Sequence, residues 1–273
     1  MQNANAFASF LIVRKGLQQI TVDGYVSTYK RFSKIIGDNP SIMEAEKYMF
    51  DFYTSAYSYN YKLNTVLSLE QYMEFIGKPT KFGRRSNPKP IIKNTLTEAE
   101  VTTMIFNCKN TREKAMIALL AYSGIRNLEL CQLKVENFLY SNNAIRIIQG
   151  KGTKDGLSEI APECTEILLK YLNEYPRNKQ DFIFTTLLKG NQMSTHDIRK
   201  WVKVITKRAK IEKRVYPHLF RHSMTANMLL RGADIISLKN QLRHSWLETT
   251  LHYANSIVFV EKNRYQKFAP SYI

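Results

Sequence analysis

Apolar residues alternate with polar ones at the spacing of helix turns along most of this 273-residue chain. Up to about residue 77, the pattern predicts four helices separated by short polar breaks, including the segment GDNP at 37–40. Tyrosine and phenylalanine are dense here, and we expect most of them to pack between the helices. The predicted helices span 3–15, 21–36, 42–57 and 61–76.

The pattern changes after residue 77. Residues 77–94 combine proline, glycine and basic side chains with little periodicity, which indicates a linker between domains. Thr97 and Glu100 then fit a capping box at the start of a new helix. The predicted organisation is an amino-terminal helical domain at 1–78, a basic linker at 79–95, and a second domain at 96–273 with a tail from about 257.

The second domain is predicted to be helical with one small β-element. Two short apolar runs, 144–148 and 157–160, flank the glycine-rich segment QGKGTKDG, which is typical of a β-hairpin. The expected fold class is therefore mainly α with a small β-hairpin or sheet. The predicted helices span 97–107, 111–122, 127–133, 165–174, 195–209, 218–231, 235–242 and 246–252.

One predicted helix concentrates unusual chemistry in a single turn. His218, Arg221 and His222 are spaced i, i+3 and i+4, so they share one helix face, while Phe220 and Met224 start a neighbouring apolar stripe. Grouped positive or protonatable side chains repel one another unless an anion lies opposite. An isolated turn of this kind is more often an ordinary surface, so its meaning depends on the rest of the chain.

The charge balance points to an anionic partner. The chain has 40 Lys and Arg against 23 Asp and Glu, a net charge of +17. Nucleic acid and an anionic membrane both fit such a charge. No apolar stretch approaches the roughly 20 residues of a spanning helix. The early run at 7–13 is short, and Arg14 and Lys15 follow it, the wrong order for a signal peptide. We therefore expect double-stranded DNA and no membrane.

Cysteine and histidine usage gives no sign of a metal or a cofactor. Cys108, Cys131 and Cys164 are far apart and form no C-x-x-C pair, so they are interpreted as free thiols in a reducing compartment, the cytoplasm. The sequence has neither an H-E-x-x-H motif nor a Walker-type phosphate loop. We expect no metal and no bound cofactor.

Four segments, in this order and spacing, make the chain resemble the tyrosine recombinase (integrase) family, especially its short Xer-type members. The resemblance covers about 96–256, together with the general form of the helical amino-terminal domain. The segments are GIRNLEL at 124–130, GKGTK at 150–154, HLFRH at 218–222 and LRHSWLETTLHY at 242–253. One departure is Arg243, which stands where the family usually has glycine.

The resemblance implies a strand-transfer enzyme that acts on DNA without a metal. Tyr253 would attack a phosphodiester and hold the strand as a 3′-phosphotyrosine. A free phenol, with a pKa of about 10, is ionised in only about one molecule in a thousand at neutral pH, so its activation requires roughly 4 kcal/mol. Paired guanidiniums and a lysine on a hairpin suit the phosphate and the leaving 5′-oxygen. The implied catalytic set is Arg126, Lys151, His218, Arg221, His244 and Tyr253.

Basic residues outside this set are expected to contact the DNA backbone. The helix at 195–209 interleaves lysines with Trp201 and Val204, and the linker and the hairpin add further cations. Glu129 is interpreted as structural, holding Arg126 or the end of its helix. The candidate DNA contacts are Arg84, Arg85, Lys154, Lys200, Lys203 and Lys207.

Several alternatives stay open from the sequence. A type IB topoisomerase-like relaxing enzyme would use similar chemistry, and a DNA-binding protein that has lost catalysis would share the fold. Within the recombinase interpretation, four protomers are expected on two synapsed sites, with accessory proteins allowed. Integration of a mobile element and resolution of chromosome dimers both remain open.

Overall fold

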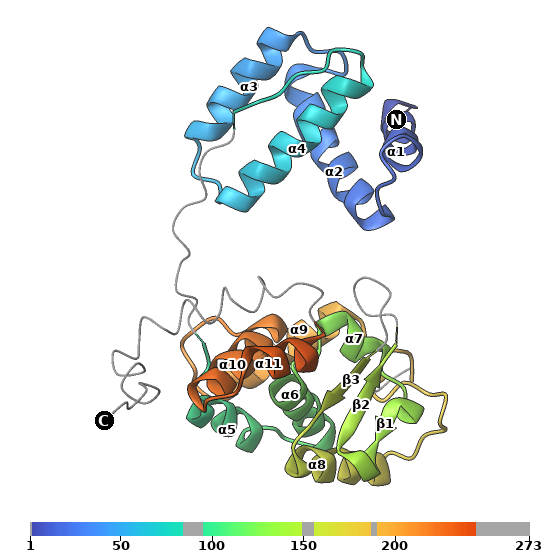
Figure 1. The fold of residues 1–273 in the computed structure, drawn as a ribbon, viewed down its shortest axis with the longest axis vertical. Coiled ribbons are helices and arrows are strands. Elements are labelled where there is room, and N and C mark those ends of the chain that lie inside the picture. Colours follow the sequence, from blue (N-terminus) through green and yellow to red (C-terminus); the bar gives the residue numbers. More distant parts are fainter. Residues whose placement is uncertain (1, 84–94, 149–155, 187–189, 244–273) are drawn as a thin grey trace, which may run out of the picture. The chain divides into compact units, whose positions relative to one another are not determined.

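A computed structural model describes residues 2–83, 95–148, 156–186 and 190–243. The chain divides into two compact units, Met1–Ile91 and Ile92–Ile273. Figure 1 labels the helices and strands of each unit. The mainly helical fold class with a small sheet, predicted from the sequence, is confirmed.

In the first unit, the described residues form four helices (Figure 1), and aromatic side chains make up much of their core. Phe7, Phe32 and Tyr72 are fully buried, and the rings of Phe7 and Phe32 lie 5.1 and 5.4 Å from that of Tyr72. The expectation that the dense aromatic residues form a core is thus confirmed. The helices are α1 (Gln2–Val13), α2 (Gln19–Ile36), α3 (Ile42–Thr54) and α4 (Tyr59–Phe75).

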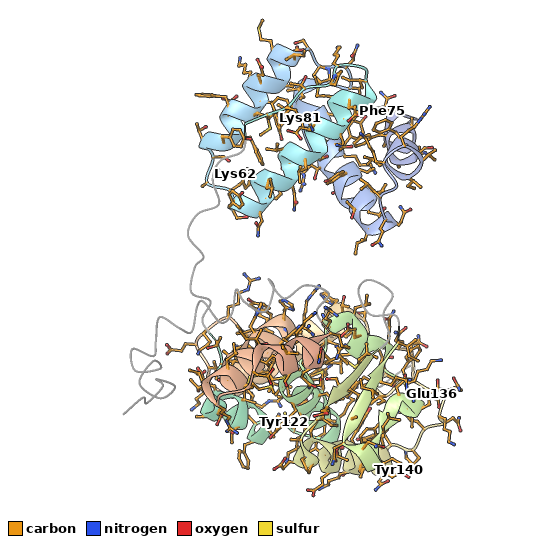
Figure 2. The ribbon with its side chains drawn as sticks, in the orientation of Figure 1. Lys62, Phe75, Lys81, Tyr122, Glu136 and Tyr140 are labelled. Atoms are coloured by element: carbon orange, nitrogen blue, oxygen red, sulfur yellow. The ribbon has the colours of Figure 1, made fainter. Side chains whose placement is uncertain are left out.

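The chain leaving α4 is fastened to the first unit. Glu70 is buried on α4, and its carboxylate accepts hydrogen bonds from the Phe82 backbone N–H (3.1 Å) and from Lys81 Nζ (3.3 Å). Lys78 donates to the Pro40 carbonyl oxygen at 3.0 Å. Figure 2 shows Lys81 on this segment. The first residues of the predicted linker therefore pack on α4, while 84–94 lie outside the described residues.

The second unit surrounds helix α6 with other helices and a three-stranded sheet. Helix α6 contacts α5, α8, α10 and β3, and its residues 115–120 are all buried. Figure 1 shows α6 between α10 and the strands. The helices are α5 (Glu98–Phe106), α6 (Thr111–Ser123), α7 (Asn127–Gln132), α8 (Pro162–Glu174), α9 (Thr195–Arg208), α10 (Pro217–Leu230) and α11 (Ile235–Leu242), with short 3-10 turns at Val135–Asn137 and Tyr140–Asn142.

The sheet contains the predicted hairpin and one further strand. Strands β2 (Ala144–Ile147) and β3 (Gly156–Glu159) pair antiparallel, and Ile147 opposite Gly156 is the last pair before the turn. The prediction of a hairpin is confirmed. A third strand, β1 (Phe138–Leu139), pairs with β2 and was missed because two residues show no alternation.

Other element boundaries also differ from the prediction. Helix α8 begins at Pro162 rather than at residue 165, because proline is well suited to the first helical position, where no N–H partner is needed. Helix α1 ends at Val13 instead of Lys15, and the chain turns through Gly16, whose φ is +62°. The predicted last helix at 246–252 lies outside the described residues.

Among the helices that the structure describes, none combines the length and apolarity needed to cross a membrane.

Candidate functional site

A tight turn between α6 and α7 positions Arg126. Gly124 ends α6 with φ 61° and ψ 23°, a left-handed conformation that favours glycine. A Cβ at this position would lie 2.8 Å from Met224 Cε on α10 and 3.0 Å from Leu242 Cδ2 on α11. The glycine therefore lets the turn pass close to both helices, and Arg126 follows at the N-cap of α7.

Arg126 is held by Glu129, three residues further along. The carboxylate accepts hydrogen bonds from Arg126 Nη1 at 2.6 Å and from the Arg126 backbone N–H at 2.8 Å. The side chain of Glu129 is 5% exposed, whereas that of Arg126 is 23% exposed. Part of the Arg126 side chain thus reaches solvent, while its backbone N–H and its Nη1 are held by Glu129. The predicted contact of Glu129 with Arg126 at the start of the helix is confirmed.

Arg221, on α10, links two segments that lie on either side of it. Its guanidinium donates from Nη1 to the Gly124 carbonyl oxygen and from Nη2 to the Leu242 carbonyl oxygen, both at 2.5 Å. The residue is 2% exposed. Gly124 lies two positions before Arg126, so the structure brings the two predicted arginines to the same turn.

Strand β3 and helix α11 are joined beside this turn. Ser158 on β3 donates its hydroxyl to the Ser123 carbonyl oxygen at 2.8 Å, next to Gly124. Gln241, near the end of α11, donates to the Glu159 carbonyl oxygen at 2.7 Å and accepts from the Glu159 N–H at 3.0 Å. The base of the hairpin, the arginine turn and the end of α11 therefore form one connected region. Sequence reasoning missed Ser158 and Gln241, because neither residue type is distinctive.

The two histidines of the 218–222 turn differ in environment. His218 is exposed near the start of α10, while His222 is buried, and their rings meet edge to face with centroids 4.4 Å apart. Phe220 and Met224 are buried on the neighbouring stripe, as predicted. Arg221 and His222 thus belong to the interior of the unit, and His218 presents an imidazole at its surface.

Arg243 takes the backbone conformation that usually belongs to glycine. It caps α11 with φ 53° and ψ 41°, in the left-handed region. Its Nη2 forms a 2.9 Å ion pair with Glu129 Oε2, and its side chain is 9% exposed. Burial alone raises the pKa of Glu129, but the charge of Arg243 and the bonds from Arg126 outweigh it, so this pKa lies below its ordinary value.

The lysines of α9 form an exposed basic face. Lys200, Lys203 and Lys207 are all exposed and are spaced i, i+3 and i+7 on this helix. Arg208, in the same basic stretch, instead donates from Nη1 to Glu113 Oε2 at 2.7 Å and is occupied within the unit. These lysines of α9 are therefore available to a polyanion.

The remaining predicted site residues lie outside the described residues. These are Lys151 and Lys154 on the hairpin turn, Arg84 and Arg85 in the linker, and His244 and Tyr253 near the end of the chain. The described part of the site thus contains Arg126, Arg221 and His218, together with Glu129 and Arg243.

No cluster of three or more His, Cys, Asp or Glu side chains suited to a metal ion occurs within the described residues. The arrangement offers guanidiniums, an imidazole and lysines, which can bind a phosphodiester and stabilise negative charge on it.

A family model and individual relatives of known type agree on the class of protein that the chain resembles. Residues 94–258 match the model of the phage integrase family. The chain is 26% identical over 269 residues to a tyrosine recombinase of Pseudothermotoga lettingae, with 92% of each chain covered. It is 29% identical over 253 residues to the tyrosine recombinase XerA of Pyrococcus horikoshii, covering 90% of this chain and 86% of the relative.

The fold is also found in solved structures. The Tn1549 transposon integrase, solved in complex with circular intermediate DNA, aligns with a TM-score of 0.71 at 17% identity, over 92% of this chain and 94% of that one. At this level of identity the likeness shows a shared fold.

Proposed function

Since the chain belongs to the phage integrase family and is a tyrosine site-specific recombinase, we propose that it cuts and rejoins double-stranded DNA through a 3′-phosphotyrosine formed by Tyr253. The observation that carries the proposal is the bond from Arg221 to the Gly124 carbonyl oxygen, two residues before Arg126. This bond fixes one guanidinium relative to the backbone that presents the other. Paired guanidiniums match the non-bridging oxygens of a phosphodiester.

Each half of the proposed reaction forms one bond to phosphorus and breaks another. The Tyr253 oxygen attacks the phosphorus and gives its phenolic proton to His218 or His244, the bond to the 5′-oxygen breaks, and Lys151 supplies the proton to that leaving oxygen. Arg126 and Arg221 stabilise the charge on the phosphate, with His218 and His244 as hydrogen-bond donors or proton carriers. In the second half, a 5′-hydroxyl attacks the phosphotyrosine and releases Tyr253. No energy-rich cofactor is consumed, because the covalent link conserves the bond.

The DNA is proposed to lie along basic side chains of both units. Lys200, Lys203 and Lys207 offer an exposed row on α9, and the proposed contacts also include Arg84, Arg85 and Lys154. In the first unit, Lys30 and Lys34 are exposed on one face of α2 and would contact the opposite side of the duplex. The two units would thus clamp the duplex, in agreement with the net charge of +17.

The working assembly is proposed to be a tetramer on two synapsed sites in the cytoplasm. A tail from about residue 257 would dock on a neighbouring protomer. The three cysteines are free thiols, which suits a reducing compartment. A truncation at Ser256 that assembles on DNA like the full chain would remove the docking of the tail from the proposal.

A covalent trap tests the function. The protein is mixed with supercoiled and nicked DNA from its source, stopped with detergent, and the attached DNA is sequenced. Y253F is expected to lose the adduct, whereas Y265F and Y272F, which remove tyrosines outside the motif, should keep it. An adduct that survives in Y253F would assign the nucleophile elsewhere. Relaxation of any plasmid without joining of sites would favour the topoisomerase-like alternative.

A further inference from the structure

Arg243 combines a backbone conformation that disfavours arginine with a buried, paired side chain. Its φ of 53° places it in the left-handed region, where a side chain is normally a disadvantage. Its guanidinium is nevertheless drawn inward to Glu129 and is 9% exposed. A residue in this conformation persists where the surrounding contacts over-determine its backbone geometry.

The contacts of Arg243 join the candidate catalytic turn to the base of the hairpin. Its Cδ occupies space over Gly156, where an added Cβ would come within 2.7 Å. Gly156 is the first residue of β3 and the last to pair with β2 before the predicted lysine-bearing turn. Any larger side chain at Gly156 would displace the arginine, so the two positions are matched to each other.

Glu129 is shared between two arginines. Its Oε1 accepts from Arg126 Nη1 at 2.6 Å, while its Oε2 accepts from Arg243 Nη2 at 2.9 Å. The carboxylate is 5% exposed, so these partners largely determine its orientation. With Oε2 engaged by Arg243, Arg126 pairs side chain to side chain through one guanidinium nitrogen, and one carboxylate charge faces two positive charges.

We propose that Arg243 is a positioning residue for the recombination chemistry: by holding Glu129 Oε2, it sets the orientation in which Arg126 meets the DNA phosphate. Without Arg243, Glu129 Oε2 keeps the bond from the Arg126 backbone N–H as its remaining described partner. The carboxylate can then reorient and take the Arg126 guanidinium into a two-pronged pair that competes with the phosphate. The proposal rests on the proposed function of Arg126. A positioning role can be told apart from a stabilising one. R243G loses the ion pair with Glu129 but also relieves the unfavourable left-handed conformation of an arginine, so the two effects on stability oppose each other.

The first test needs no DNA. In protein with nitrogen-isotope-labelled arginine, the side-chain NMR signal of Arg126 is assigned by its loss in R126K. R243G is expected to shift or broaden this signal, and R243K, which keeps a cation, should restore most of it. K210G is the matched control, because Lys210 is also left-handed, with φ 55°, and is exposed. An Arg126 signal unchanged in R243G would overturn the proposal.

The second test separates DNA binding from cleavage. The probe is the duplex recovered in the covalent trap, used in single-turnover adduct formation. R243G is expected to slow cleavage on the order of tenfold to a hundredfold, with the dissociation constant for the duplex changed by less than about twofold, because one displaced guanidinium leaves the other phosphate contacts in place. R243K should recover much of the rate, and K210G should match wild type. Cleavage by R243G at the wild-type rate would overturn the proposal.

A double-mutant cycle identifies the route. If Arg243 acts through Glu129, adding R243G to E129Q should slow cleavage much less than R243G does alone. Fully additive losses would contradict the proposed route. A wild-type chain that forms no adduct, while R243G still shifts the Arg126 signal, would count against the proposed function and support the positioning of Arg126.

Discussion

The guanidinium of Arg221 donates to the carbonyl oxygen of Gly124 across 97 positions of sequence. This one bond joins α10 to the turn that presents Arg126, and a second bond from the same side chain reaches the end of α11. The planar guanidinium can donate to both carbonyl oxygens at once because its donors lie on separate nitrogens. The single ammonium of a lysine cannot reproduce this geometry. The site is thus organised around a buried arginine that also faces the chemistry in the proposed mechanism.

R221K should therefore lose both stability and activity. We expect the free energy of unfolding to fall by about 2 kcal/mol, because one of two buried carbonyl oxygens loses its partner. We expect covalent adduct formation to fall on the order of a hundredfold or more. Urea unfolding and the covalent trap measure the two effects. R231K, at an exposed pair with Glu98, serves as the control and should change neither.

Alanine at Gly124 and at Gly190 should separate the cost of backbone strain from the cost of steric crowding. G124A imposes a side chain on a left-handed backbone and brings its Cβ within 2.8 Å of Met224 Cε. Gly190 has nearly the same φ, +64°, with nothing within 4 Å of an added Cβ, so G190A carries the strain alone. We expect G124A to be less stable than G190A by about 1–2 kcal/mol in urea unfolding. Equal losses would mean that Met224 and Leu242 move aside at no cost.

Lowering the pH should reduce the free energy of unfolding of the wild-type chain more than that of E129Q. The pKa of Glu129 in the folded protein is lowered from the ordinary 4.5, so its ionised form contributes stability. That contribution is complete above pH 4.5 and is lost as the pH falls through the lower folded value. The difference in unfolding free energy between wild type and E129Q should therefore shrink below pH 4.5. Parallel pH curves for the two proteins would contradict this origin of the shift.

The basic face of α9 makes a prediction about salt. Lys203 and Lys207 are exposed, so K203Q/K207Q should weaken DNA binding and reduce the slope of log affinity against log salt by about 0.9 for each phosphate that these lysines neutralise. K170Q/K179Q, at two other exposed lysines of the same unit, is the matched control for net charge. Equal changes in slope for both double variants would indicate general attraction rather than contact along α9.

The sequence predicted those features that depend on local patterns. The capping box at Thr97, glycine at the end of α6 and alternating runs around the hairpin define elements through neighbours a few residues apart. The motif around Arg126 also revealed the role of Glu129, since three positions on a helix are adjacent in space.

What the sequence did not predict depends on contacts between distant segments. Arg221 carries the pattern of a phosphate-binding residue, yet its burial and its two carbonyl partners follow from the packing of α6, α10 and α11. The sequence alone marks Arg243 only as a departure from the usual glycine of the family. Its turn toward Glu129 requires knowing that α11 ends opposite α7, across 114 positions. Strand β1 is two residues long and depends on β2 for its definition.

The bond from Ser158 to the Ser123 carbonyl oxygen has a consequence for protein engineering. It anchors β3 at Ser158, which lies two residues inside the last pair before the turn, Ile147 and Gly156, so this bond helps to set the register of the strand independently of the residues that join β2 to β3. Loop insertion costs little once both ends are fixed. Residues 148–155 can therefore be exchanged for hairpin tips of other lengths and sequences that keep a lysine for the proposed proton transfer, and such grafts should leave the arginine scaffold unchanged.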